Sequence, residues 1–133
     1  MQDTPLQEKK PGRVSRLHSF KYALEGLRFL LRTQPNAQIH AAISISAVGA
    51  GWFFGITAAD WRWLLVMMLW VWFAEAMNTA FEYLCDIVSP EFNVSVKRAK
   101  DIAAGAVLLT AIVAFILGIL IFWPYVASLM RRG

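Results

Sequence analysis

Three long apolar segments, separated only by short polar stretches, constrain this chain more than any other feature. They cover about residues 39–56, 61–88 and 101–125. A helix needs about 20 mostly apolar residues to cross the roughly 30 Å hydrocarbon core of a bilayer, and each segment approaches or exceeds that length. Hydrophobic residues make up 58% of the 133 residues, more than is usual for a soluble domain. We therefore predict an all-α membrane protein with three transmembrane helices.

The segment before the first span has an amphipathic pattern. In residues 15–32, apolar side chains recur at steps of three or four, which predicts a helix with one apolar face. The residues of that face are Leu17, Phe20, Leu24, Leu27 and Leu31. Charged side chains occupy most of the remaining surface, as in helices that lie in the membrane interface. We expect the polar residues 1–14 to be a disordered cytoplasmic tail and residues 126–133 to be a short C-terminal tail.

Small residues mark expected packing faces on two of the spans. Ala47, Gly51 and Gly55 recur at intervals of four in the first span, and the third span has a similar stripe. That second stripe consists of Ala104, Ala111, Ala114 and Gly118. Small side chains let helix backbones approach closely inside a membrane, so both stripes predict helix contacts.

The distribution of basic residues predicts the orientation of the chain. Seven of the thirteen Lys and Arg precede Gln34, and the second loop ends in Lys97, Arg98 and Lys100. Beside apolar spans, such segments are typical of contact with anionic lipid rather than nucleic acid. The positive-inside rule places the N-terminus and the second loop in the cytoplasm. Arg131 and Arg132 then lie outside, against the rule.

A stripe of acidic and amide side chains lies in the second half of the second span. Glu75, Asn78, Glu82 and Asp86 project within about an 80° sector of one helix face at 100° per residue. Carboxylates near membrane depth are costly and usually serve a function. The alternative is that the helix leaves the membrane near Glu82 and that the stripe is an ordinary solvated face.

Carboxylates in this arrangement suit Mg²⁺, a hard cation that binds oxygen ligands and often bridges to nucleotide phosphates. A carboxylate without metal can accept a proton from an alcohol. Lys97, Arg98 and Lys100 can neutralise polyphosphate or, as an alternative, anchor to lipid headgroups. The chain has no Walker A sequence, no kinase glycine loop and no HRD motif, so phosphoryl transfer needs another scaffold. Cys85 is the only cysteine, which excludes an intrachain disulfide.

Together these residues resemble the small prokaryotic diacylglycerol kinase and undecaprenol kinase family over about residues 16–122. The matching motifs are F-x-x-A-x-x-G-L-R at 20–28, N-x-x-I-H at 36–40, E-x-x-N-T-A-x-E-x-x-x-D at 75–86 and A-K-D at 99–101. The last two are specific together, because charges at fixed spacing are rare in apolar spans. The resemblance implies a single kinase domain over 15–125 in a bacterial inner membrane, and a homotrimer whose sites are shared between subunits.

The resemblance also implies roles for individual residues. Glu75 is expected to be the general base on a lipid hydroxyl, and Glu82 a ligand of Mg²⁺. Asn78 and Asp86 are expected to complete the site, and Lys100 and Asp101 to bind ATP. Gln34 stands where most members have a glutamate as second metal ligand, so the amide oxygen is expected to take that place.

The sequence thus predicts an ATP- and magnesium-dependent kinase for a membrane lipid alcohol. Diacylglycerol and undecaprenol are the expected acceptors, and another lipid or isoprenoid alcohol is an alternative. From a different class, a non-catalytic trimeric membrane protein that has kept the family fold is the competing interpretation, and Gln34 is the feature that favours it.

Overall fold

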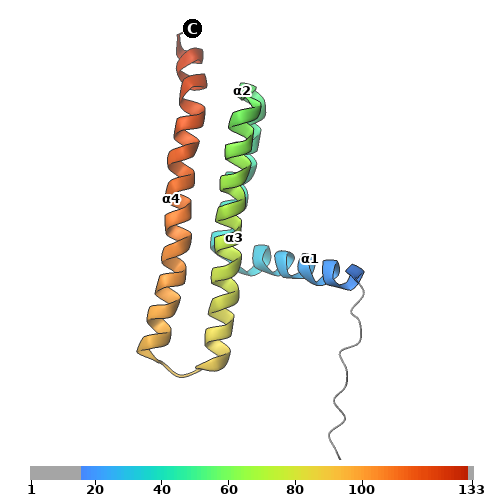
Figure 1. Cartoon of the computed structure of the whole chain (residues 1–133), viewed down its shortest axis with the longest axis vertical. Helices are drawn as coiled ribbons and strands as arrows, with labels where there is room; N and C mark the ends of the chain where they lie inside the picture. The colour runs from blue at the N-terminus through green and yellow to red at the C-terminus, as the bar shows by residue number, and fades with distance from the viewer. Residues whose placement is uncertain (1–15, 132–133) are drawn as a thin grey trace, which may run out of the picture.

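The structure, a computed structural model, describes residues 16–131. This part of the chain forms four helices and no strand: α1 (Arg16–Thr33), α2 (Pro35–Phe54), α3 (Ala58–Val88) and α4 (Val94–Met130). Figure 1 shows α2, α3 and α4 running along the long axis, while α1 lies across them at the beginning of α2. The tail expected at residues 1–14 lies outside the described residues.

Within the described residues, α2, α3 and α4 are long and apolar enough to cross a membrane. This confirms the prediction of an all-α membrane protein with one helix before three spans. Of the apolar side chains of α1 that were expected to share a face, Phe20, Leu24, Leu27 and Leu31 are exposed. An exposed apolar face on a helix lying across the bundle fits burial in the membrane interface.

The first span begins and ends earlier than the apolar pattern predicts. α2 starts at Pro35, because a proline at the first helical position needs no hydrogen-bond acceptor for its nitrogen. It ends at Phe54, since Gly55 adopts a left-handed conformation with φ of 60° and caps the helix. Gly55 therefore terminates the helix and does not extend a packing stripe, and Gly51 is buried against the ring of Trp61.

The turn between α2 and α3 is tied to α4 by hydrogen bonds. Thr57 and Asp60 form a reciprocal capping box at the start of α3. The Tyr125 hydroxyl of α4 donates to Oδ2 of Asp60 at 2.6 Å and accepts from the backbone N–H of Thr57 at 3.1 Å. A small apolar core at this end consists of Ile56 of the turn, Leu64 of α3 and Ile121 of α4, and Ala47 and Phe54 of α2 pack against it.

The third span is longer than predicted at both ends. Asn93 caps α4 by accepting from the N–H groups of Ser95 and Val96, so the helix begins inside the expected loop. It continues through Pro124 to Met130, beyond the predicted end at residue 125. A proline inside a transmembrane helix is tolerated because neighbouring groups satisfy the freed carbonyl. Helical structure thus includes residues 126–130 of the expected C-terminal tail.

α2 and α4 flank α3 and leave an apolar groove of about 400 Å³ between them. Ala111, Ala114 and Gly118 of α4 line this groove together with Ser44 and Ala47 of α2. Most of the predicted small-residue stripe of α4 therefore borders open apolar space, whereas Ala104 lies outside the groove lining and is exposed.

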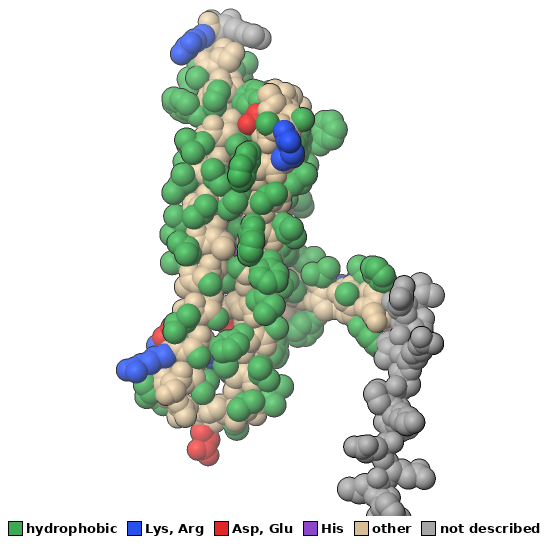
Figure 2. Space-filling view, in the orientation of Figure 1, with side chains coloured by type: hydrophobic (Ala, Val, Ile, Leu, Met, Phe, Trp, Pro, Cys, Tyr) green, Lys and Arg blue, Asp and Glu red, His purple; other side chains and the backbone are tan. Residues whose placement is uncertain are grey.

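Helix length sets the depth of each residue. At 1.5 Å per residue, the 20 residues of α2 span about 30 Å, which matches the hydrocarbon core. The 31 residues of α3 and the 37 of α4 span about 46 Å and about 55 Å, so both extend beyond it. Figure 1 shows the α3–α4 hairpin reaching past α1, and Figure 2 shows charged side chains gathered at the two ends of the bundle.

Candidate functional site

The acidic stripe of α3 runs from the apolar zone into water. Because α3 starts beside the end of α2 and runs back along it, Glu75 lies about 26 Å from the start of α3, just inside a 30 Å core. Glu82 and Asp86 lie about 36 Å and about 42 Å along the helix, beyond that core. The stripe therefore joins a position at lipid depth to positions accessible to a water-soluble ligand.

Burial follows the same gradient. Glu75 is 1% exposed and Asn78 is 8% exposed, whereas Glu82 is half-buried and Asp86 is exposed. The alternative of an ordinary solvated face therefore does not hold for Glu75 and Asn78. Among the described residues, Glu75 Oε2 and Asn78 Oδ1 have no hydrogen-bond partner. Buried polar atoms are nearly always paired, so these two oxygens mark a place where a further group belongs.

Asn78 links the buried and exposed parts of the stripe. Its Nδ2 donates to Oε1 of Glu82 at 3.0 Å, across one helical turn. This hydrogen bond holds the Glu82 carboxylate on the side of α3 that carries Glu75. It also directs the amide oxygen of Asn78 away from Glu82, which leaves that oxygen free to accept from another group.

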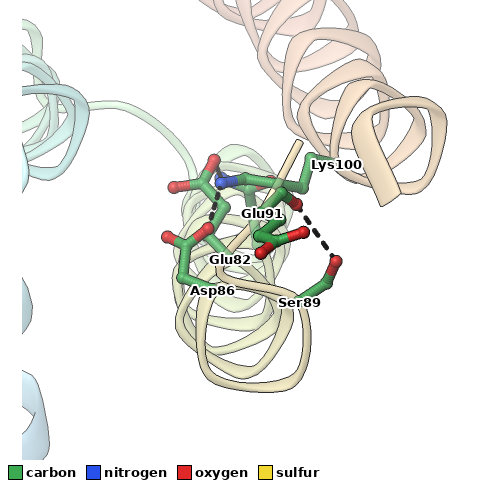
Figure 3. Close-up of polar contacts among 6 residues, drawn as sticks. Glu82, Asp86, Ser89, Glu91 and Lys100 are labelled. Atoms are coloured by element: carbon green, nitrogen blue, oxygen red, sulfur yellow. Dashed lines mark hydrogen bonds and ion pairs between the residues drawn. The ribbon is translucent and has the colours of Figure 1, made fainter. Parts of the chain in front are cut away.

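Lys100 brings α4 into the site. Its Nζ lies 2.8 Å from Oδ1 of Asp86, and Figure 3 shows the side chain crossing from α4 to this carboxylate next to Glu82. The loop between the helices is closed by a hydrogen bond from Ser89 Oγ to the Glu91 carbonyl at 3.2 Å. The α3–α4 hairpin therefore brings Lys100 next to the acidic stripe.

Two predicted site residues are not joined to the stripe. Asp101 accepts from Lys97 Nζ at 2.6 Å along α4, so its carboxylate faces its own helix. Gln34 caps α2 at the α1–α2 corner, and its Nε2 donates to Thr33 Oγ1 at 3.4 Å. In residues 16–131 no hydrogen bond connects Gln34 to Glu75, Glu82 or Asp86.

The site offers few protein ligands for a magnesium ion. The described residues of one chain contain no cluster of three or more His, Cys, Asp or Glu side chains that can hold a metal. The Glu82 carboxylate is nevertheless a hard oxygen donor at the half-buried part of the stripe. Mg²⁺ commonly takes only one or two protein carboxylates and completes its shell with phosphate and water, so Glu82 fits as one such ligand.

Two polar residues of the site were not given roles from the sequence. Thr79 is 6% exposed and its hydroxyl has no partner among the described residues. Its position four residues after Glu75 places it at about 40°, beside the stripe, which is the signal that sequence reasoning missed. His40 of α2 lines the apolar groove.

Fold and site together define a small integral-membrane protein whose acidic site crosses the boundary between the apolar bilayer and water. Comparison with known proteins places this arrangement in a family: the prokaryotic diacylglycerol kinase model matches residues 21–122. The chain belongs to that family, and it is a lipid kinase.

Named relatives agree with this assignment. An undecaprenol kinase of Bacillus subtilis is 33% identical over 106 residues, which is 80% of this chain and 86% of the relative. A diacylglycerol kinase of Synechocystis is 36% identical over 115 residues, covering 86% of this chain and 66% of the relative. A diacylglycerol kinase of Escherichia coli is 29% identical over 105 residues, with 78% and 85% covered.

Proposed function

We propose that this protein transfers the γ-phosphoryl group of ATP to the hydroxyl of diacylglycerol or undecaprenol at the cytoplasmic face of the bacterial inner membrane. The observation that carries the proposal is the depth of the stripe. Glu75 lies at the level where a lipid hydroxyl resides, and Glu82, Asp86 and Lys100 lie about 10 Å or more nearer to water. One face of α3 thus extends from the apolar zone that contains the lipid alcohol to the aqueous zone that contains ATP.

The chemistry follows from these positions. The buried Glu75 carboxylate accepts the hydroxyl proton while the alcohol oxygen forms a bond to the γ-phosphorus, and the bond from that phosphorus to the bridging oxygen breaks, releasing ADP. Lys100 is then available to pair with phosphate oxygens, exchanging Asp86 for a polyphosphate. Asp101 joins the nucleotide only if it leaves Lys97.

We assign the magnesium site to the Glu82 carboxylate, which Asn78 holds in place by its hydrogen bond. A divalent cation there neutralises charge on the transferred phosphoryl group. Gln34 contributes as a second protein ligand only if the α1–α2 corner approaches Glu82, either within the chain or from another subunit. The open groove between α2 and α4 is apolar and has small residues of both helices in its lining, which supports a homotrimer in which a neighbouring helix packs there.

Phosphate transfer by the purified protein tests the proposal. Radiolabelled ATP is supplied with Mg²⁺ and with diacylglycerol or undecaprenol in separate mixed-micelle assays, and label is counted in the extracted lipid. We expect label in at least one lipid, and a decrease in kcat of roughly 10²–10⁴-fold for Glu75→Gln with little change in the KM for ATP.

The matched control is Glu25→Gln, which removes an exposed carboxylate of α1 and should leave kcat unchanged. If the folded protein labels neither lipid, the acceptor is a different lipid alcohol or the protein is the non-catalytic alternative. The presence of Gln34 in place of the usual glutamate favours the second case. A Glu75→Gln variant with normal kcat and weak ATP binding would reassign Glu75 to the nucleotide.

A further inference from the structure

Thr79 does not use its hydroxyl in the way that other hydroxyls in these helices do. Thr33 Oγ1 donates to the Phe29 carbonyl at 2.9 Å, Ser46 Oγ to the Ala42 carbonyl at 2.8 Å, and Thr110 Oγ1 to the Val107 carbonyl at 2.8 Å. Such bonds to the preceding turn are the usual solution for a hydroxyl inside a helix. Thr79 Oγ1 is buried and makes no such bond within the described chain. This hydroxyl is therefore available to a further group.

The unpaired atoms of this region belong to three neighbouring side chains of α3. Glu75, Asn78 and Thr79 are all more than nine-tenths buried, and each keeps one oxygen without a partner among residues 16–131. Residues three and four apart on a helix are surface neighbours, about 5–6 Å between Cβ atoms. Asn78 and Thr79 therefore each neighbour Glu75, one on either side of it around the helix, and we take the position between the three oxygens as a candidate ligand position.

Counting donors and acceptors shows what the position requires. An ionised Glu75 oxygen and the Asn78 amide oxygen only accept hydrogen bonds, and Thr79 supplies a single donor. Two acceptor oxygens thus face a single donor. A water molecule satisfies all three groups, because it donates to Glu75 and to Asn78 and accepts from Thr79. These three bonds match the number that buried waters usually make.

We propose that Thr79 is a positioning residue that binds this water and, in the Michaelis complex, the hydroxyl oxygen of the lipid alcohol that replaces it. An alcohol accepts from Thr79 as the water does and directs its single proton to Glu75. Thr79 thus orients the oxygen that reacts without exchanging a proton itself. This inference rests on the proposed kinase reaction. It identifies Thr79 as the residue that sets the direction of the O–H bond of the lipid alcohol.

Thr79→Val tests the inference, since valine keeps the shape of threonine and removes the hydroxyl. We expect kcat to fall roughly tenfold to a hundredfold, as for a misdirected reacting group, with an unchanged KM for ATP. Thr79→Ser restores the hydroxyl and should recover kcat. Thr110→Val is the matched control, because the Thr110 hydroxyl bonds only to its own helix in α4 and should not affect kcat.

Thermal unfolding in detergent provides a readout that does not require activity. If Thr79 binds a buried water, Thr79→Val removes one of the hydrogen bonds of that water. The unfolding temperature then falls more than it does for Thr110→Val. If the hydroxyl is unpaired, its removal leaves the unfolding temperature unchanged or raises it. Should the valine variant not fold, Thr79→Ser against Thr79→Ala isolates the hydroxyl in the same two measurements.

The outcomes separate this inference from the proposed function. Wild-type kcat in Thr79→Val with an unchanged or raised unfolding temperature overturns the role of Thr79 and leaves the kinase intact. Failure of Thr79→Ser to recover kcat also overturns it, because the methyl group would then be the essential part. If the wild-type protein phosphorylates neither lipid, the unfolding temperatures alone decide whether the hydroxyl is paired.

Discussion

A methyl group added at Gly51 tests the packing of the α2–α3 turn, which sets how α2 lies against the site helix. A Cβ atom built at Gly51 lies 2.8 Å from Cη2 and 2.9 Å from Cζ2 of Trp61. Favourable contacts between carbon atoms occur at about 3.5–4.0 Å, so the ring must move. Trp61 is at the start of α3 and packs against Trp52 with ring centroids 5.8 Å apart, which limits that movement.

The expected size of the effect comes from two opposing terms. Alanine stabilises a helix relative to glycine by about 1 kcal/mol. Overpacking of a well-filled site costs about 1–3 kcal/mol. Gly49 provides the reference, because a Cβ atom there meets nothing within 4 Å and only the favourable term remains. We expect Gly49→Ala to stabilise the protein, and Gly51→Ala to be less stable than Gly49→Ala by about 1–3 kcal/mol.

Reversible unfolding in mixed micelles, followed by helical circular dichroism as denaturing detergent is added, measures both variants on one scale. Tryptophan fluorescence reports the Trp61 environment in the same samples. Equal free energies of unfolding for Gly49→Ala and Gly51→Ala would show that Trp61 does not lie against Gly51. The position of α2 across α3 would then need to be revised.

The remaining predictions concern the site. Glu82→Gln should abolish lipid phosphorylation at any Mg²⁺ concentration while leaving the protein folded in detergent, and wild-type turnover at high Mg²⁺ would remove Glu82 from the metal site. Gln34→Glu should lower the Mg²⁺ concentration needed for half-maximal activity by roughly tenfold to a hundredfold if position 34 faces the ion, whereas an unchanged titration excludes it as a ligand. Lys100→Gln should raise the KM for ATP by roughly tenfold or more, because its ammonium group reaches the stripe. Lys21→Gln, which breaks an exposed pair on α1, is its control and should leave the KM unchanged.

The local pattern of the sequence was sufficient for the architecture. Hydrophobic run length predicts a transmembrane helix because the bilayer core requires each segment to satisfy its own backbone. Helical periodicity likewise placed Glu75, Asn78, Glu82 and Asp86 on one face, since angular position depends only on spacing. The ends of the helices were less predictable, as α2 and α4 show, because caps such as Gly55 and Asn93 override hydropathy.

Only the tertiary structure decided the environment of each site residue. Which carboxylate Lys100 pairs with depends on how the hairpin brings together positions separated by 14 residues, and helical spacing along α4 predicts only the pair of Lys97 with Asp101. The burial of Glu75, Asn78 and Thr79 depends on neighbouring helices. Periodicity placed these residues on one face of α3. Their unpaired oxygens, however, became evident only once packing had removed water from around them.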